Sequence, residues 1–279
     1  MRWTKAGRSK NLEDRRGASG MRLGGGGKLG LGGLAILLVL SVVFKQDFLS
    51  LAGGGGALAP GAEAVAPLDD PAEEEMVRFV SFVLDDAQQV WAQVFAQEGS
   101  QYPPATLVLF REGVGSACGS ASSAVGPFYC PGDQKVYIDL GFFTDLDRRF
   151  GAPGDFAQAY VLAHELGHHI QHVVGTEAQM RQAQQRDPSR ANELSVRLEL
   201  QADCLAGVWG YYAAQRGVLE PGDAEEGLAA AAAIGDDRLM RGAGQRANPE
   251  SFTHGTSAQR VEWFRRGLNS GRIDACQTF

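Results

Sequence analysis

The sequence predicts an α+β fold, dominated by helices with a small β-sheet and preceded by one N-terminal transmembrane helix. Beyond residue 72, apolar residues recur mostly at helical spacing, and only two short runs, 106–110 and 135–140, are rich in β-branched and aromatic residues. This balance is typical of the α+β class. The chain of 279 residues shows no internal repeat, so we expect one domain at residues 72–279.

A membrane anchor is expected at residues 29–44, which are uncharged and lie between Lys28 and Lys45. A helix of this length spans about 24 Å, and snorkelling of the two lysines can make up the difference from a hydrocarbon core of about 30 Å. Residues 1–28 carry eight basic and two acidic residues, which favours a basic cytoplasmic head. The Gly-, Ala- and Pro-rich residues 45–71 then form a linker to an extracytoplasmic domain.

Two alternatives to this anchor are open. A buried core helix is disfavoured by the basic head and by the glycine runs on both sides of the apolar segment. A cleaved signal peptide is the stronger rival, because Ala57-Leu58-Ala59 resembles a cleavage site. However, Pro60 follows that site, and the apolar run ends thirteen residues before it. We therefore favour an uncleaved single pass through the inner (cytoplasmic) membrane, with the N-terminus in the cytoplasm.

The expected domain is acidic. Outside residues 1–28 the chain carries 18 basic and 31 acidic residues, and the net charge of the whole chain is −7. A protein that binds nucleic acid needs a basic face for the phosphate backbone. The composition therefore argues against a nucleic-acid partner.

Several helices are expected between and after the two strands. The first covers residues 73–97, and the acids that follow Pro71 suit its first turn. A largely apolar helix covers residues 157–174, and the next opens at Pro188, with Asp187 as its cap, and closes at Gly217. Two further helices are expected at residues 224–241 and 257–268. The Gly-, Ser- and Ala-rich stretch between the two strands is interpreted as a loop.

Four cysteines fit an exported domain. An even count favours two disulfides, although the sequence alone allows three pairings and does not exclude free buried thiols. We expect Cys118 to pair with Cys130 across one loop, and Cys204 to pair with Cys276, which would tie the C-terminal segment to a helix. A zinc site made of all four cysteines is disfavoured because no CxxC pair exists.

The apolar helix at 157–174 contains an HExxH motif, His164-Glu165-Leu166-Gly167-His168. Residues four apart lie on one helix face, so both histidines can reach one ion. Zinc accepts imidazole nitrogen, and a catalytic zinc ion keeps one position for water. Glu165 is then the candidate base that takes a proton from this water. The motif by itself also occurs by chance, but three ionisable groups in an apolar helix need a partner, and a metal ion supplies one.

Glu199 is the best candidate for a third ligand, and Glu193 is the next. Two histidines and one glutamate form a set used by hydrolytic zinc sites. Asp203 lies four residues beyond Glu199 and can accept the second ring N–H of a ligand histidine, whereas Glu193 has Arg197 at that spacing. The longer metzincin pattern fails, because Gln171 and Val174 stand at its last two positions. We interpret His169 and His172 as polar residues of the rim or core.

The sequence resembles the bacterial neutral zinc metallopeptidase family over nearly its whole length except the linker. The likeness rests on residues 163–171, on ELQADCLAGVW at 199–209, and on GPFYCP at 126–131 with VYID at 136–139; the N-terminal residues 1–3 and 11–17 also resemble the family. The resemblance implies a zincin-like fold, one zinc ion and an N-terminal anchor. The segment Thr253-His254-Gly255, followed by Arg260, is similar to one in membrane-associated zinc endopeptidases, in which a histidine assists the transition state. We therefore add His254 as a candidate catalytic residue.

These observations predict a membrane-anchored zinc metallopeptidase that acts on a peptide or protein. Zinc would polarise the peptide carbonyl, Glu165 would transfer the proton, and His254 would help to hold the oxyanion. We expect the strand at 136–140 to pair with an extended substrate, unless it is an ordinary edge strand. Two rival interpretations are a catalytically silent relative that uses the fold for binding at the cell envelope, and a purely structural zinc module. Intact Glu165 argues against the first, and the lack of an evident fourth ligand argues against the second.

Overall fold

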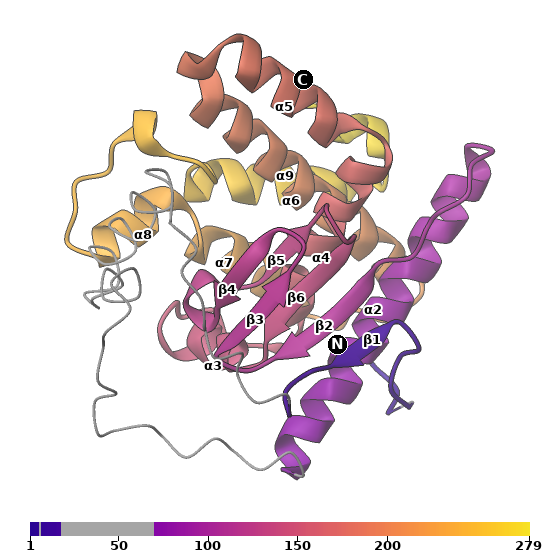
Figure 1. The fold of residues 1–279 in the computed structure, drawn as a ribbon. Helices are drawn as coiled ribbons and strands as arrows, with labels where there is room; N and C mark the ends of the chain where they lie inside the picture. The colour runs from indigo at the N-terminus through magenta and orange to yellow at the C-terminus, as the bar shows by residue number, and fades with distance from the viewer. Residues whose placement is uncertain (6, 18–69) are drawn as a thin grey trace.

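The structure is a computed structural model that describes residues 1–5, 7–17 and 70–279 (Figure 1). The expected anchor at 29–44 and the alternative cleavage site at 57–59 lie outside the described residues, as does nearly all of the expected linker. Among the helices of the described ranges, none is long and apolar enough to span a membrane.

A four-stranded sheet lies beside a helical layer (Figure 1). Its order is β1 (Leu12–Asp14), β2 (Thr106–Phe110), β6 (Lys135–Asp139) and β5 (Phe128–Cys130). The first three strands are parallel to one another, and β5 is antiparallel to β6 at the edge. The two strands expected from the sequence are confirmed as β2 and β6, which are central and buried.

Alternate residues of β2 serve the two faces of the sheet, as the period of a strand requires. Leu107 and Leu109 belong to the main core with the helices, whereas Val108 and Phe110 pack with Tyr137 on the opposite face. A separate hairpin, β3 (Gly113–Ser116) and β4 (Gly119–Ser122), contributes Val114 to this second cluster. The region expected to be a loop therefore holds three strands. β3 and β4 were missed because their Gly- and Ser-rich sequences show no apolar alternation, and β5 was missed because it is only three residues long.

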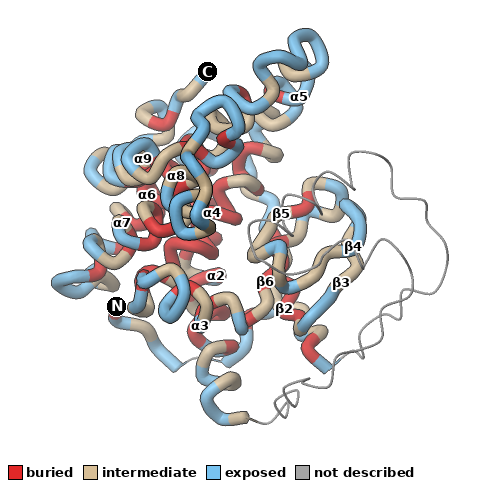
Figure 2. The backbone as a smooth tube through the Cα atoms, turned by 90° about the vertical axis from the view of Figure 1, so that its left-hand side faces the viewer, coloured by how far each residue is buried: buried red, intermediate tan, exposed pale blue. Residues whose placement is uncertain are grey.

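Eight helices are present in the described ranges. They are α2 (Pro71–Gln97), α3 (Gly141–Arg148), α4 (Asp155–Val173), α5 (Thr176–Arg186), α6 (Ala191–Gln215), α7 (Asp223–Ala233), α8 (Asp236–Gly242) and α9 (Ser257–Ser270). Single 3-10 turns cover Ser123–Val125, Pro188–Arg190, Pro249–Ser251 and Ile273–Cys276. Buried side chains concentrate in the central helices α4 and α6, whereas α5 and the β3–β4 hairpin are largely exposed or half-buried (Figure 2).

The expected helix at 224–241 is wrong in one respect, since the chain divides it into α7 and α8. The break falls at Gly235, where a β-carbon would lie 2.4 Å from the backbone nitrogen of Ser257. The chain bends there because the start of α9 packs against it. The expected helices at 73–97, 157–174 and 257–268 correspond to α2, α4 and α9, with small differences at their ends.

Helices α6 and α9 meet backbone to backbone. A β-carbon on Gly207 would lie 2.2 Å from the carbonyl oxygen of Phe264, and one on Gly267 would lie 1.9 Å from that of Cys204. Real atoms never approach so closely, so both positions require glycine. This close crossing brings Arg260, two turns before Gly267, against the middle of α6.

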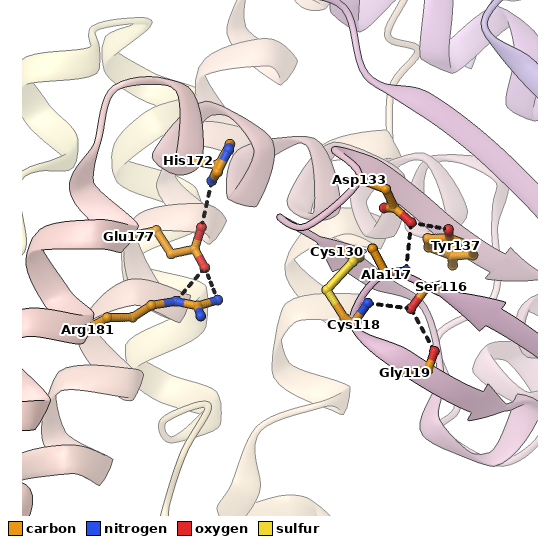
Figure 3. The surroundings of a disulfide bond; sticks show 10 residues. All are labelled: Ser116, Ala117, Cys118, Gly119, Cys130, Asp133, Tyr137, His172, Glu177 and Arg181. Atoms are coloured by element: carbon orange, nitrogen blue, oxygen red, sulfur yellow. Dashed lines mark hydrogen bonds and ion pairs between the residues drawn. A yellow bond between two sulfur atoms is a disulfide. The ribbon is translucent and has the colours of Figure 1, made fainter.

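Both expected disulfides are present in the structure. Cys118, in the turn between β3 and β4, is bonded to Cys130 at the end of β5 (Figure 3). Cys204 in α6 is bonded to Cys276 in the last 3-10 turn. The first bond holds the exposed hairpin to the edge strand, and the second holds the C-terminal segment to α6.

The first residues of the chain differ from the separate basic head that we expected at 1–28. Residues 12–14 form a strand of the sheet, Met1 is buried, and Arg16 is 4% exposed. Residues 1–5 and 7–17 are therefore part of the domain, and the domain does not begin at residue 72. The hydropathy and charge that suggested a head describe composition and carry no information on strand pairing.

Candidate metal centre

His164 and His168 lie one turn apart on α4, and Glu199 on α6 faces both. The Nε2 atom of His164 lies 3.2 Å from Oε2 of Glu199, and the Nε2 atom of His168 lies 3.5 Å from Oε1 of the same carboxylate. One ligand atom from each residue lies within 4.8 Å of the others. The structure thus brings together the three residues that the sequence suggested as ligands.

The outward nitrogens of both rings are held by acceptors. Nδ1 of His164 lies 2.8 Å from a carboxylate oxygen of Asp203, and Nδ1 of His168 lies 2.9 Å from Oε1 of Gln171. The amide nitrogen of Gln171 donates to the carbonyl oxygen of Leu198 at 2.7 Å, which fixes the orientation of the amide. Since Asp203 and the amide oxygen only accept, each Nδ1 carries a proton and donates it. In the neutral form of each ring, the lone pair on Nε2 then faces Glu199 and is available to a metal ion.

This arrangement fits one zinc ion. Two imidazole nitrogens and a carboxylate converge, the second nitrogen of each ring is already engaged, and three protein ligands leave a position for water. A structural zinc site would need a fourth protein ligand. No other histidine, cysteine or acidic residue of the described ranges joins this cluster.

Charge at the cluster also favours a cation. Burial lowers the pKa of His164, but the charge of Asp203 and hydrogen bonds to Asp203 and Glu199 raise it to about 10. Burial raises the pKa of Glu199, but the charge of His168 and hydrogen bonds from both histidines hold it well below its ordinary value. The half-buried Glu199 and the buried Asp203 therefore stay ionised beside the rings, and positive charge is stabilised between them.

Glu165 is 8% exposed and lies on the same helix as the two histidines. In the part of the chain that the structure describes, no hydrogen bond or ion pair engages its carboxylate, whereas Glu199 and Asp203 are both engaged. A carboxylate without a fixed partner next to the cluster is free to accept a proton from water. This placement agrees with the role that the motif suggests for Glu165.

A buried hydrogen-bond network lies on the Nδ1 side of His164. The guanidinium of Arg260 donates to both carboxylate oxygens of Asp203, each at 2.9 Å, and the hydroxyl of Tyr160 also donates to Asp203. Arg260 is 2% exposed, and Asp203 is fully buried. Burial raises the pKa of Asp203, but the charges of Arg260 and His164 lower it below its ordinary value. Arg260 thus keeps Asp203 ionised and in place to orient the His164 ring.

No role was predicted for Tyr160 or Arg260 from the sequence, although the sequence contains one indication that Arg260 is buried. Arg260 occupies the same helical stripe as Phe264 and Gly267, and both of these residues are buried. A charged residue on an apolar stripe needs a buried partner. The sequence does not identify Asp203 as that partner, because the partner belongs to another helix.

Replacing Arg260 by lysine is expected to weaken zinc binding by about 10- to 100-fold, the range usual for groups that orient metal ligands. Lysine keeps the charge but cannot hold both oxygens of Asp203, so the His164 ring loses its fixed orientation. The measurement is zinc affinity, by competition with a chromogenic chelator. Arg266→Lys, an exposed change on the same helix, is the control. Equal affinities in the two variants would contradict this role of Arg260.

His254 lies outside the cluster, in a turn that packs on α6. Its turn packs on α6 beside Glu199, since a β-carbon on Gly255 would touch Val196 and Leu200 at 3.2 and 3.4 Å. Nδ1 of His254 lies 3.2 Å from Asp236, which also accepts the backbone N–H of His254 at 2.7 Å. Burial lowers the pKa of His254, but the hydrogen bond to Asp236 and the charges of Glu199 and Asp236 raise it. Asp236 was not predicted from the sequence as a partner of His254.

The other acidic and histidine candidates lie elsewhere. His169 is fully buried, accepts from the hydroxyl of Tyr129 at 3.0 Å and donates to the carbonyl oxygen of Pro103 at 2.7 Å. His172 is 32% exposed and pairs with Glu177, opposite the Cys118–Cys130 bond (Figure 3). These positions agree with our interpretation of both histidines as core and rim residues. The alternative ligand Glu193 is exposed and pairs with Arg190 and Arg197, so it does not belong to the cluster.

The prediction that the strand at 136–140 pairs with an extended substrate needs a correction. β6 is internal, because β2 pairs with its whole length and β5 pairs with its first three residues. At residues 135–137, β6 is therefore paired with a neighbouring strand on both sides. β5 is the terminal strand of the sheet, and its central residue Tyr129 contacts α4 through His169.

The chain is similar to one protein family and to several known proteins. The family model described as "Putative neutral zinc metallopeptidase" matches residues 1–279. The "Uncharacterized protein YpfJ" of Escherichia coli (strain K12) is 46% identical over 287 residues, which cover 100% of this chain and 99% of that protein. The "Uncharacterized protein Mb2605" of Mycobacterium bovis is 49% identical over 182 residues, which cover 61% of each chain. No solved structure matches.

Proposed function

Because the chain belongs to the neutral zinc metallopeptidase family, we propose that it hydrolyses peptide bonds at the cluster of His164, His168 and Glu199. The proposal takes one zinc ion as cofactor and Glu165 as general base. A single observation carries it: the Nε2 atoms of both histidines and the Glu199 carboxylate converge, while the Nδ1 atoms are held from behind. A site preorganised in this way needs no rearrangement to bind metal.

A zinc ion bound there supplies Lewis acidity and lowers the pKa of water to near 7. The chain's own residues then perform the proton transfers. Glu165 accepts a proton from the attacking water and donates it to the leaving amine. Asp203 and Gln171 keep the two histidine rings in the donor tautomer throughout. His254, in the turn that packs on α6 beside Glu199, is our candidate donor to the oxyanion.

We propose that an extended substrate lies along β5. Edge strands offer unpaired N–H and C=O groups, and a peptide can pair with them by strand addition. Tyr129 and Cys130 hold this strand to α4 and to the β3–β4 hairpin respectively. The edge is therefore fixed relative to Glu165, and backbone pairing positions the scissile bond without selecting particular side chains.

We also propose that the domain works outside the cytoplasm. All four cysteines are paired in the structure. Disulfides persist in oxidising compartments and are rare in the cytosol.

The proposed function is tested by zinc analysis together with cleavage of a generic unfolded protein such as casein. We expect about one zinc ion per chain and hydrolysis that is abolished by a chelator and restored by zinc. Zinc without any hydrolysis would favour the catalytically silent binding protein. A purified chain that binds no zinc would overturn the ligand assignment itself.

Replacing His254 by alanine is expected to lower kcat by about 10²- to 10³-fold, the usual effect of losing one oxyanion donor. Zinc content and Tm should change little, because His254 is 51% exposed and does not belong to the ligand cluster. His172→Ala, which removes a half-buried histidine at the rim, is the matched control. A variant that loses stability but keeps its turnover would show that His254 only orders its turn.

A further inference from the structure

Residues 1–17, apart from residue 6, are described and are built into the catalytic domain. β1 pairs with β2 in the register Leu12–Leu107, Glu13–Val108 and Asp14–Leu109. Two backbone hydrogen bonds of 2.8 Å bracket the strand, from Leu107 to Asn11 and from Arg15 to Leu109. β1 thereby covers the edge of β2, which would otherwise be the open edge of a buried parallel sheet.

Side chains attach the same segment to α2. Arg16 is 4% exposed and donates to both carboxylate oxygens of Asp14, and it also forms an ion pair of 3.2 Å with Glu73. Ser9 donates to Asp85 at 2.6 Å, and the ring of Trp3 packs edge-on against Phe79. A guanidinium is buried only where carboxylates compensate the loss of water. The contact is therefore specific, and it requires the residues of both segments.

Further charged pairs extend the contact. Lys135 of β6 donates to Glu13 at 2.6 Å, and Arg8 pairs with Glu74 and Asp14. The hydrogen bonds from Arg16 lower the pKa of Asp14 to about 2 although burial raises it. The basic residues that suggested a cytoplasmic head are thus partly used as internal partners of the domain.

From these contacts we infer that residues 1–17 and residues 70–279 occupy the same side of any membrane in the folded protein. A single crossing by the apolar run at 29–44 would place β1 and β2 on opposite sides and would break their pairing. The topology that hydropathy favours, with a cytoplasmic N-terminus and an exported domain, is incompatible with this sheet. Together with the two disulfides, the pairing places the N-terminal segment outside the cytoplasm with the domain.

Thiol labelling in intact bacterial cells tests the inference on the full chain. Because the native cysteines are all paired, an introduced cysteine is the single free thiol. Lys10→Cys reports on the N-terminal segment and Gln93→Cys on α2, since both positions are exposed. Peptide mapping without reductant verifies that both disulfides persist in each variant.

A membrane-impermeant maleimide should label both positions to the same extent before permeabilisation. Labelling of Gln93→Cys in intact cells, with Lys10→Cys labelled only after permeabilisation, would overturn the inference. The result does not depend on peptidase activity, so the inference and the proposed function can fail independently.

Limited proteolysis of the purified full chain tests the docking itself. Trypsin should cleave after Lys10 and Arg15 at least about tenfold more slowly than in the urea-unfolded chain, because cleavage requires local opening. Arg16→Met should accelerate both cleavages, since it leaves Asp14 and Glu73 without this partner. Arg2→Met, a change at a side chain that is 73% exposed, is the control. Wild-type cleavage as fast as in the unfolded chain would show that β1 is not docked.

Discussion

Replacing Glu165 by glutamine is expected to lower kcat by about 10²- to 10⁴-fold, the range attributed to general acid–base catalysis. Glutamine has nearly the same shape as glutamate but cannot accept a proton at neutral pH. The fold should be unaffected, because no hydrogen bond or ion pair in the described residues depends on this carboxylate. Turnover of an unfolded protein substrate, measured beside zinc content, checks the prediction.

Zinc content is the essential companion measurement for Glu165→Gln. The variant should bind as much zinc as the wild type, since Glu165 is not one of the converging ligands. Glu177→Gln, which changes a carboxylate at the rim that pairs with His172 and Arg181, is the control. Unchanged turnover in Glu165→Gln would exclude this residue as the base. Loss of zinc would instead indicate that Glu165 is a ligand.

Replacing His168 by alanine is expected to remove zinc almost completely and to abolish hydrolysis. The change deletes one of three ligand atoms, so the loss of affinity should exceed the about 10- to 100-fold typical of groups that only orient a ligand. It also removes a group that faces Glu199, which leaves that half-buried carboxylate with one histidine partner. Metal analysis after dialysis against a weak chelator is the measurement.

His172→Ala provides the matched control for His168→Ala, because it lies one turn further along α4 and points to Glu177. It should retain zinc and activity. Full zinc occupancy in His168→Ala would refute the proposed ligand set. Loss of zinc in both variants would point to a general effect on the helix rather than to coordination.

The elements that the sequence predicted well are those with a strong local pattern. The α4 helix carries its apolar residues and the HExxH motif within nineteen residues, so its position and its chemistry are both readable locally. The central strands β2 and β6 are likewise short runs of β-branched and aromatic residues. Glu199 and Asp203 were found because a zinc site requires a third ligand and a group that orients the ring, and four-residue spacing supplies both.

The features that the sequence missed depend on contacts between distant segments. β1 has no apolar alternation and becomes a strand only because β2 offers an edge. Residues 224–241 look continuous, but Gly235 bends the chain where α9 approaches. Arg260 meets Asp203 only because Gly207 and Gly267 allow two helices to touch. None of these partners can be identified from the local sequence.

The position of Cys276 has a consequence for when the metal centre can form. Its backbone carbonyl accepts from Gln201, whose own amide oxygen accepts from Gln171, the residue that orients His168. Cys276 is also bonded to Cys204, one residue beyond Asp203. The hydrogen bond from Gln201 and the disulfide to Cys204 can therefore form only after residue 276 has been synthesised. A chain that has not yet reached residue 276 lacks these contacts, so we expect the centre to be completed late in synthesis.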